Sequence, residues 1–361
     1  MRLENWLMEN ADSVIRYRIA NEFIKDGNNC DLKDLQQKML ENTEVQLWLE
    51  NLRLKIPSQD RRHDMVHGSF DFSFENAMLK ALQLGLHAGI PQLDDALQFY
   101  FRYLQNEAAN TDKKRTLFYS NIIASMLLKA GYRTELVVSY MKGSLDELYS
   151  FTRLKNYDIY VENRSEFKGL PTIWKNKPII KPEIFVRFGF GYPMIYDMIG
   201  LSAMYQLGDT DINEKIENVV DYIVNDEFHD KIADGYGIIP EPEDRAPGRA
   251  KYHGMGWDPK LPGYYNMDEY VKTNPARLLF FADIMCDYPG VVKSRWYNDA
   301  ITIFEQFKTS NGTYCFPKEF LREKGGYAVQ GFHLGLGENR RKKLWCEIES
   351  TFRMVRLKSK L

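Results

Sequence analysis

The sequence predicts an all-α protein, a single α/α toroid over residues 1–361 in which about five or six helical hairpins close into a ring. Apolar residues recur with helical spacing along most of the chain, and strand-like runs are few. Helices that are apolar all round alternate with helices that have one apolar face. Stacked pairs bury such faces, and closing the stack into a ring buries the first kind of helix on every side. An open array of helical pairs is the alternative.

The first half of the chain shows four helical pairs in succession. Residues 1–55 are expected to form two N-terminal helical hairpins, and the next two pairs turn at Ala88-Gly-Ile-Pro and at Gly131. The expected segments are, in order, Asn5–Ile24, Leu32–Leu54, Phe74–His87, Leu93–Leu104, Thr116–Ala130 and a shorter helix near Thr134–Met141.

The contrast between the two kinds of helix is clearest in the second half. Pro193–Leu207 is apolar nearly all round, whereas Asn213–Asn225 places its aliphatic residues on one face. The same contrast repeats in Pro275–Cys286 and Trp296–Phe307, and Asn339–Met354 adds a last helix. An inner helix paired with an outer one is therefore the expected repeat.

Two regions interrupt this rhythm. Residues 156–187 combine short β-prone runs with Pro and Gly, which predicts an irregular insertion or small hairpin. Residues 234–270 form a long loop that is rich in Gly, Pro and aromatic side chains. Loops of that length are usually functional or disordered, and so many aromatic residues argue against disorder.

Composition and charge exclude several classes of protein. The 48 basic and 50 acidic residues give a net charge of -2, so no global field favours nucleic acid. No segment has the length and apolarity of a membrane span, and no signal peptide is visible, which predicts a cytoplasmic protein. The four cysteines lie far apart in sequence, so we expect buried, reduced thiols. Aromatic residues, at 14%, are the one compositional excess.

Several short stretches resemble bacterial proteins grouped loosely with squalene cyclases and protein prenyltransferase β-subunits. They are Trp6-Leu-Met-Glu-Asn-Ala-Asp-Ser-Val-Ile-Arg-Tyr17, Phe190-Gly-Tyr-Pro-Met-Ile-Tyr-Asp197, Leu207-Gly-Asp, and turns such as Asn311-Gly-Thr-Tyr-Cys-Phe-Pro. The resemblance spans most of the chain and implies the toroid. It implies no activity, because many members of the group have no assigned function.

The catalytic motifs of the characterised members are not matched. The chain lacks the Asp-x-Asp-Asp acid of triterpene cyclases, and Asp209-Thr-Asp211 is better interpreted as a helix N-cap. The zinc-binding Asp-x-Cys pair of prenyltransferases is also missing, since Asp283 and Cys286 have the wrong spacing. We therefore expect neither a metal nor a cofactor.

A functional site is expected where the inner helices begin. All inner helices of such a ring run parallel, so their N-termini converge at one end and suit an anionic or hydroxyl-rich group. The segments that lead into these helices, and the long loop, carry the unusual residues. The candidate catalytic residues are Asp197, Asp234, His253 and His333. The candidate ligand-binding residues are His67, Arg187, Tyr192, Tyr236, Tyr252, Trp257, Tyr264, Glu338 and Arg340.

Three functions remain open at this point. The first is a small-molecule-binding protein or enzyme with an aromatic central cavity, acting on an isoprenoid-like ligand. The second is a carbohydrate-active lyase or hydrolase on the same plan, with Arg187 binding a uronate. The third is a non-catalytic helical scaffold that presents its aromatic loops to a protein. A deep aromatic tunnel would favour lipids, and an open cleft with carboxylates and aromatic platforms would favour sugars.

Overall fold

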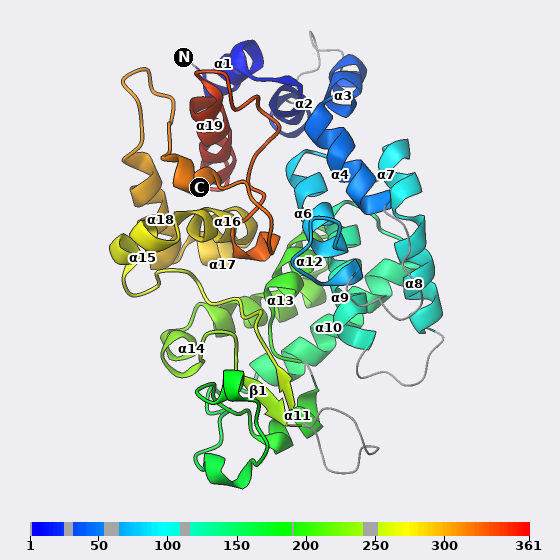
Figure 1. Cartoon of the computed structure of the whole chain (residues 1–361), viewed down its shortest axis with the longest axis vertical. Coiled ribbons are helices and arrows are strands. Elements are labelled where there is room, and N and C mark those ends of the chain that lie inside the picture. Colours follow the sequence, from blue (N-terminus) through cyan, green and yellow to red (C-terminus); the bar gives the residue numbers. More distant parts are fainter. Residues whose placement is uncertain (1, 25–31, 54–64, 109–115, 190, 241–251) are drawn as a thin grey trace.

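The computed structural model describes residues 2–24, 32–53, 65–108, 116–189, 191–240 and 252–361 (Figure 1). Helices dominate this part of the chain, as the all-α prediction requires. The one sheet within it is a two-stranded antiparallel hairpin of β1 (Ile238–Pro240) and β2 (Tyr252–Gly254). Residues 54–55, residues 241–251 of the aromatic loop, and Cys30 lie outside the described ranges.

The helices of the first half follow the predicted pairs with three differences. The segment Asn5–Ile24 is broken at Ala11, and Leu93–Leu104 is divided at Leu97. The helix Glu135–Thr152 continues well past the expected end at Met141 because Leu145, Leu148 and Phe151 extend its buried face. The helices are α1 (Leu3–Asn10), α2 (Ser13–Glu22), α3 (Leu32–Leu40), α4 (Thr43–Arg53), α6 (Phe74–Gln83), α7 (Pro91–Ala96), α8 (Gln98–Ala108), α9 (Thr116–Lys129) and α10 (Glu135–Thr152).

The second half also keeps the predicted order of helices, but the last helix begins at Trp345 and not at the predicted Asn339. Asp209 accepts a hydrogen bond from the Ile212 amide and caps the next helix, so the N-cap interpretation is confirmed. The helices are α11 (Pro182–Phe188), α12 (Ile195–Tyr205), α13 (Thr210–Ile223), α14 (Asp226–Lys231), α15 (Met267–Thr273), α16 (Pro275–Met285), α17 (Pro289–Val292), α18 (Arg295–Glu305) and α19 (Trp345–Lys358).

The contrast between inner and outer helices is present in the burial of their residues. Every residue of α12 from Ile195 to Met204 is buried, whereas α13 buries only one face. Helices α6 and α16 resemble α12, and α18 resembles α13. Helices α9 and α12 pack closely because Gly200 has no side chain where a Cβ would meet the Ser125 backbone at 2.8 Å.

Helix contacts connect the two ends of the chain. Helix α9 packs on α6 and α12, α12 on α16, and α16 on α19. Helix α19 in turn packs on α1 and α2, and Figure 1 shows α19 beside these helices, with both chain ends nearby. The amide of Asp12 donates to the Glu338 carboxylate over 2.7 Å, which joins residues 326 positions apart in sequence.

The two irregular regions meet in space. Residues 156–187 contain the 3-10 turns η2 (Arg164–Glu166) and η3 (Thr172–Trp174) and most of α11. An isolated bridge pairs Tyr160 with Ile180, and a second bridge links Ile179 to Ile238 of β1. The insertion therefore supports the hairpin of the aromatic loop.

Two of the cysteines differ from the prediction of buried thiols. Cys286 is buried, but Cys315 is exposed and Cys346 is half-buried, and all three are unpaired. Cys315 is exposed because it belongs to the loop between α18 and the last helix. No helix in the described ranges has both the length and the apolarity needed to cross a membrane.

Candidate functional site

The first turns of three inner helices meet around His67. Glu75 lies in the first turn of α6, Phe118 in that of α9, and Tyr196 in that of α12. These helices lie in the middle of the molecule (Figure 1). The carbonyl of Trp257, in the aromatic loop, accepts a hydrogen bond of 2.9 Å from the Ile195 amide and so caps α12. The first turns of α6, α9 and α12 therefore meet at the place where His67 and Trp257 lie together.

Four aromatic side chains surround His67, and we call them the aromatic cage. The ring centroids of Trp257, Phe118, Tyr327 and Tyr196 lie 4.8, 5.2, 5.5 and 6.1 Å from that of the imidazole. The His67 side chain is 17% exposed, so it remains in contact with solvent. An imidazole in such surroundings is shielded from bulk water without being sealed from it.

The buried carboxylate of Glu75 orients the imidazole. Its Oε1 lies 2.8 Å from His67 Nδ1 and accepts the Gly68 amide at 2.7 Å, and its Oε2 accepts the Tyr196 hydroxyl. Burial raises the pKa of Tyr196 well above its usual value, so the phenol keeps its proton and donates it to Glu75. A carboxylate oxygen accepts hydrogen bonds, so the His67 tautomer that fits this contact carries its proton on Nδ1. The lone pair of Nε2 is then available for acid–base chemistry.

Asp197 lies near the cage, and its oxygens are occupied. Its Oδ2 accepts the Met194 amide at 2.7 Å, and its Oδ1 accepts hydrogen bonds from Asn121 and Ser144. Burial raises the pKa of this carboxyl to about 6, although these hydrogen bonds lower it. Asp197 therefore holds the N-terminus of α12. It also lines a cavity of 170 Å³ that Phe118, a member of the cage, shares.

Asp234 and Tyr264 belong to a different, more open cavity of 450 Å³. Tyr264 stacks on His229 with ring centroids 3.6 Å apart, and burial lowers the pKa of His229 to about 4. Asp234 is largely exposed and pairs with Lys260 at 3.3 Å. This cavity lies along α14, α15 and the start of α16, so these two residues do not reach His67 through any described contact.

Five other candidates of the middle region have packing or surface positions. Tyr192 and Tyr236 are fully buried with ring centroids 5.6 Å apart, and the Tyr236 hydroxyl donates to the Pro193 carbonyl at 2.7 Å. The Tyr252 hydroxyl donates to Lys168, and His253 lies opposite Ile239 in the β-hairpin. Arg187 is exposed and covers the Phe188 ring.

The remaining candidates lie near the join between the chain's two ends. His333 packs on Trp48 with ring centroids 4.9 Å apart, and its Nε2 lies 3.0 Å from the Gly326 carbonyl. Arg340 lies 3.7 Å from the buried Glu349. Glu338 contacts Asp12 of the N-terminal region. The four predicted catalytic residues thus occupy four different environments.

Sequence reasoning missed Glu75, Phe118, Tyr196 and Tyr327. Glu75 carried a usable signal, because a carboxylate in the first turn of an all-round apolar helix must find buried donors. Tyr196 precedes the predicted Asp197 by one residue, yet it is Tyr196 that faces the cage. The two rings Phe118 and Tyr327 carried no distinguishing pattern.

A cavity of 610 Å³ lies at the other ends of the same helices. Its lining includes the last turns of α2, α6, α9, α16 and α19, and charged side chains are more numerous there than aromatic ones. The predicted aromatic lining is therefore not found in this cavity. Four aromatic side chains instead surround His67 at the first turns of α6, α9 and α12, and other aromatic clusters, such as Phe304, Phe316 and Phe320, lie elsewhere in the described residues.

Comparison with known proteins finds no relative of this chain. No family model matches the chain, and no curated protein or solved structure is significantly similar to it.

Proposed function

We propose that the chain closes into an α/α toroid and acts as an enzyme on a small hydroxyl-rich molecule, with His67 as its acid–base group. The packing of α19 on α1 and α2 supports ring closure. Closure would make α2, α6, α9, α12, α16 and α19 the inner helices, which is the arrangement that the squalene cyclase and prenyltransferase resemblance implies. The inner-helix N-termini would then surround the aromatic cage.

One observation carries the proposal of catalysis: His67 is held by a buried carboxylate inside an otherwise aromatic environment. An imidazole whose Nδ1 is fixed by a carboxylate presents Nε2 in a defined direction. A histidine that served only packing would not require Glu75 to accept from three donors, His67, Gly68 and Tyr196. Burying that carboxylate is unfavourable unless partners replace its lost hydration, and these three donors do so while they fix the ring.

The cage favours a carbohydrate-like substrate over an isoprenoid. The rings of Trp257 and Tyr327 lie 4.7 Å apart and offer aromatic surfaces beside a polar group, which suits the apolar faces of a sugar ring. An isoprenoid chain needs a long apolar tunnel. The larger described cavities, of 450 and 610 Å³, both carry several charged side chains in their walls. The carbohydrate-active lyase or hydrolase is accordingly the function we propose.

The test compares two histidine variants on a panel of neutral and uronic oligosaccharides. We expect release of new reducing or unsaturated ends by the unaltered protein, and a loss of at least about 100-fold in His67→Gln. His87→Gln is the matched control, because His87 bonds to Tyr17 at the other ends of the helices and should keep activity. No turnover and no thermal shift with any sugar would contradict the proposal and leave the scaffold alternative ahead.

A further inference from the structure

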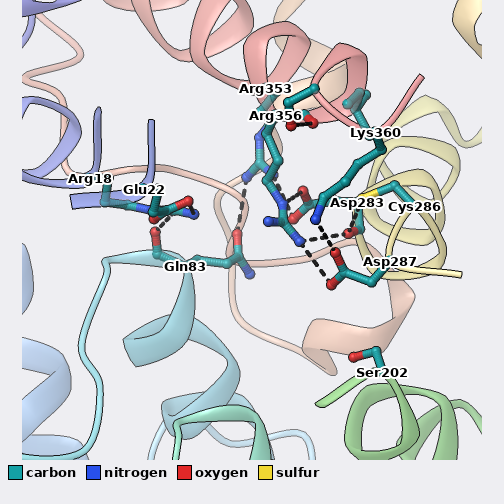
Figure 2. A network of polar contacts seen from close by, with 12 residues as sticks. Arg18, Glu22, Gln83, Ser202, Asp283, Cys286, Asp287, Arg353, Arg356 and Lys360 are labelled. Atoms are coloured by element: carbon teal, nitrogen blue, oxygen red, sulfur yellow. Dashed lines mark hydrogen bonds and ion pairs between the residues drawn. The ribbon is translucent and has the colours of Figure 1, made fainter. Parts of the chain in front are cut away.

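Four cationic side chains surround only two carboxylates where the inner helices end. Arg356 pairs with Asp283 at 2.6 Å and with Asp287 at 3.3 Å. Asp287 also forms ion pairs with Lys129 at 2.6 Å and with Lys360 at 2.9 Å. The fourth cation, Arg353, lies 3.5 Å from Asp283 (Figure 2). We call Lys129, Arg353, Arg356 and Lys360 the cationic cluster.

The cationic cluster is partly withdrawn from water. The side chains of Arg353, Arg356, Lys129 and Lys360 are 3, 17, 22 and 33% exposed. Asp287 is 2% exposed, and its three cations hold the pKa of its carboxyl well below the usual range although burial raises it. With Asp283 and Asp287 ionised, the group retains an excess of two positive charges, part of which the buried Glu349 near Arg353 can offset. Like charges this close repel one another strongly where water is scarce.

Three members of the cationic cluster form part of the wall of the 610 Å³ cavity. Lys129, Arg356 and Lys360 all line it, and Arg133 adds a further cation. Arg18 lines it as well, but Glu22 neutralises that guanidinium at 2.6 Å. The volume falls within the range of small-molecule sites. A compact anion would therefore find both space and a charge of opposite sign.

A hydrogen-bond donor in the cavity wall is also unused. The Gln83 side-chain oxygen accepts from Arg353 at 3.0 Å, whereas its buried Nε2 has no partner among the described residues. Figure 2 shows Gln83 at the edge of the network, with its amide oxygen facing Arg353. A buried amide without an acceptor is unfavourable, and a rotation of the Gln83 side chain toward the cavity that it lines would let a ligand oxygen accept from it.

We propose that this cavity binds a compact dianion, either a phosphate or a small dicarboxylate, at the opposite ends of the helices from His67. The two oxyanion classes share the required chemistry, which is two negative charges and several acceptor oxygens within reach of Lys129, Arg356 and Lys360. The site does not depend on the proposed carbohydrate chemistry, because none of its residues belongs to the aromatic cage.

The test is isothermal titration calorimetry with inorganic phosphate and, separately, malonate at constant ionic strength. We expect saturable binding of at least one of them, and the arm that binds identifies the class. Lys360→Gln and Arg133→Gln should each raise Kd by about 10-fold or more, the usual effect of a charge-assisted hydrogen bond. Lys358→Gln is the matched control, because Lys358 is the last residue of α19, two positions before Lys360, but pairs with Glu305.

The structure also defines what would overturn this proposal. Each inner helix ends with about half a negative charge, and these ends could balance the cationic cluster without a ligand. Absence of binding up to 10 mM of either anion, a concentration far above about 1 mM for a weak specific site, would establish that balance. Equal weakening by Lys358→Gln and Lys360→Gln would show nonspecific binding instead. Circular dichroism of each variant establishes that the fold is intact.

Discussion

Replacing Glu338 by Gln should remove a pH dependence of stability that arises at the join between the chain's two ends. Burial raises the pKa of the Glu338 carboxyl to about 8 from the usual 4.5, and Asp12 and Glu349 add repulsion. Its Oε1 accepts the Asp12 amide, whereas its Oε2 is buried without a described partner. A glutamine keeps the acceptor and never acquires the charge.

The sign and size of the effect follow from these pKa values. Between pH 4.5 and 8 the folded protein holds a proton that the unfolded chain releases, so the free energy of unfolding falls as pH rises. The difference between the two pKa values corresponds to at most about 5 kcal/mol. At pH 5 we expect the two proteins to differ by less than about 1 kcal/mol. At pH 8.5 the variant should be more stable by about 2 to 5 kcal/mol.

The assay is urea unfolding followed by circular dichroism at pH 5 and pH 8.5. Glu319→Gln is the control, because Glu319 is exposed and its substitution should leave the pH dependence unchanged. Parallel pH curves for the unaltered protein and Glu338→Gln would refute the reasoning, since they would mean that Glu338 is ionised in the folded state without penalty.

Three further predictions concern packing, buried charge and thiol chemistry. Gly200→Ala should lower the free energy of unfolding by about 1 to 3 kcal/mol, because the added Cβ would meet the α9 backbone. Gly143→Ala is the control, because its Cβ would enter open space and should not lower that free energy. Urea unfolding of both variants measures the difference. Lys80→Met should lower the free energy of unfolding by about 3 to 5 kcal/mol, because Lys80 is fully buried and pairs with Glu323 at 2.8 Å. An unchanged midpoint of urea unfolding would contradict this prediction. The side chains of Cys315 and Cys346 interact, and burial and this neighbour raise the pKa of Cys346 to about 12. A hydroperoxide should oxidise the exposed Cys315 to a sulfenic acid, and the Cys346 thiol should then condense with it, slowly because little of it is thiolate, to release water and form a disulfide. Peptide mapping by mass spectrometry should find that cross-link with two hydrogens fewer, and recovery of only reduced or over-oxidised Cys315 would exclude it.

Helical periodicity predicted the helices, because the spacing of apolar residues along a helix shows whether it is buried on every side or on one side only. The all-round apolar α12 and the one-faced α13 were both recognisable before any contact was known. The position of His67 near the start of α6 also followed from the expected direction of the inner helices. Sequence could therefore identify the end of the molecule where aromatic side chains gather.

The details of the site depend on contacts between distant segments, which a local pattern does not encode. His333 looked similar to His67 in sequence, but it packs on Trp48 and lies 3.6 Å from both Asp71 and Glu323 at the join between the chain's ends. The carboxylate that orients His67 lies eight residues away, at Glu75, and the phenol that donates to it lies 121 positions further, at Tyr196. Both histidines have carboxylate and aromatic neighbours, so only the folded arrangement shows that the four rings of the aromatic cage surround His67 and not His333.

The contact between the first and last helices has a consequence for synthesis of the chain. Asp12 meets Glu338 across 326 positions, so α1 and α2 leave the ribosome long before the helix that covers them exists. Until α19 is made, the surfaces of α1 and α2 that it covers stay exposed. Proteins that depend on contacts between distant parts of the sequence have the same difficulty during folding. Chaperone dependence and slow final folding should therefore concentrate in the interval before α19 is made. A chain stopped short of Trp345 would remain in that vulnerable state.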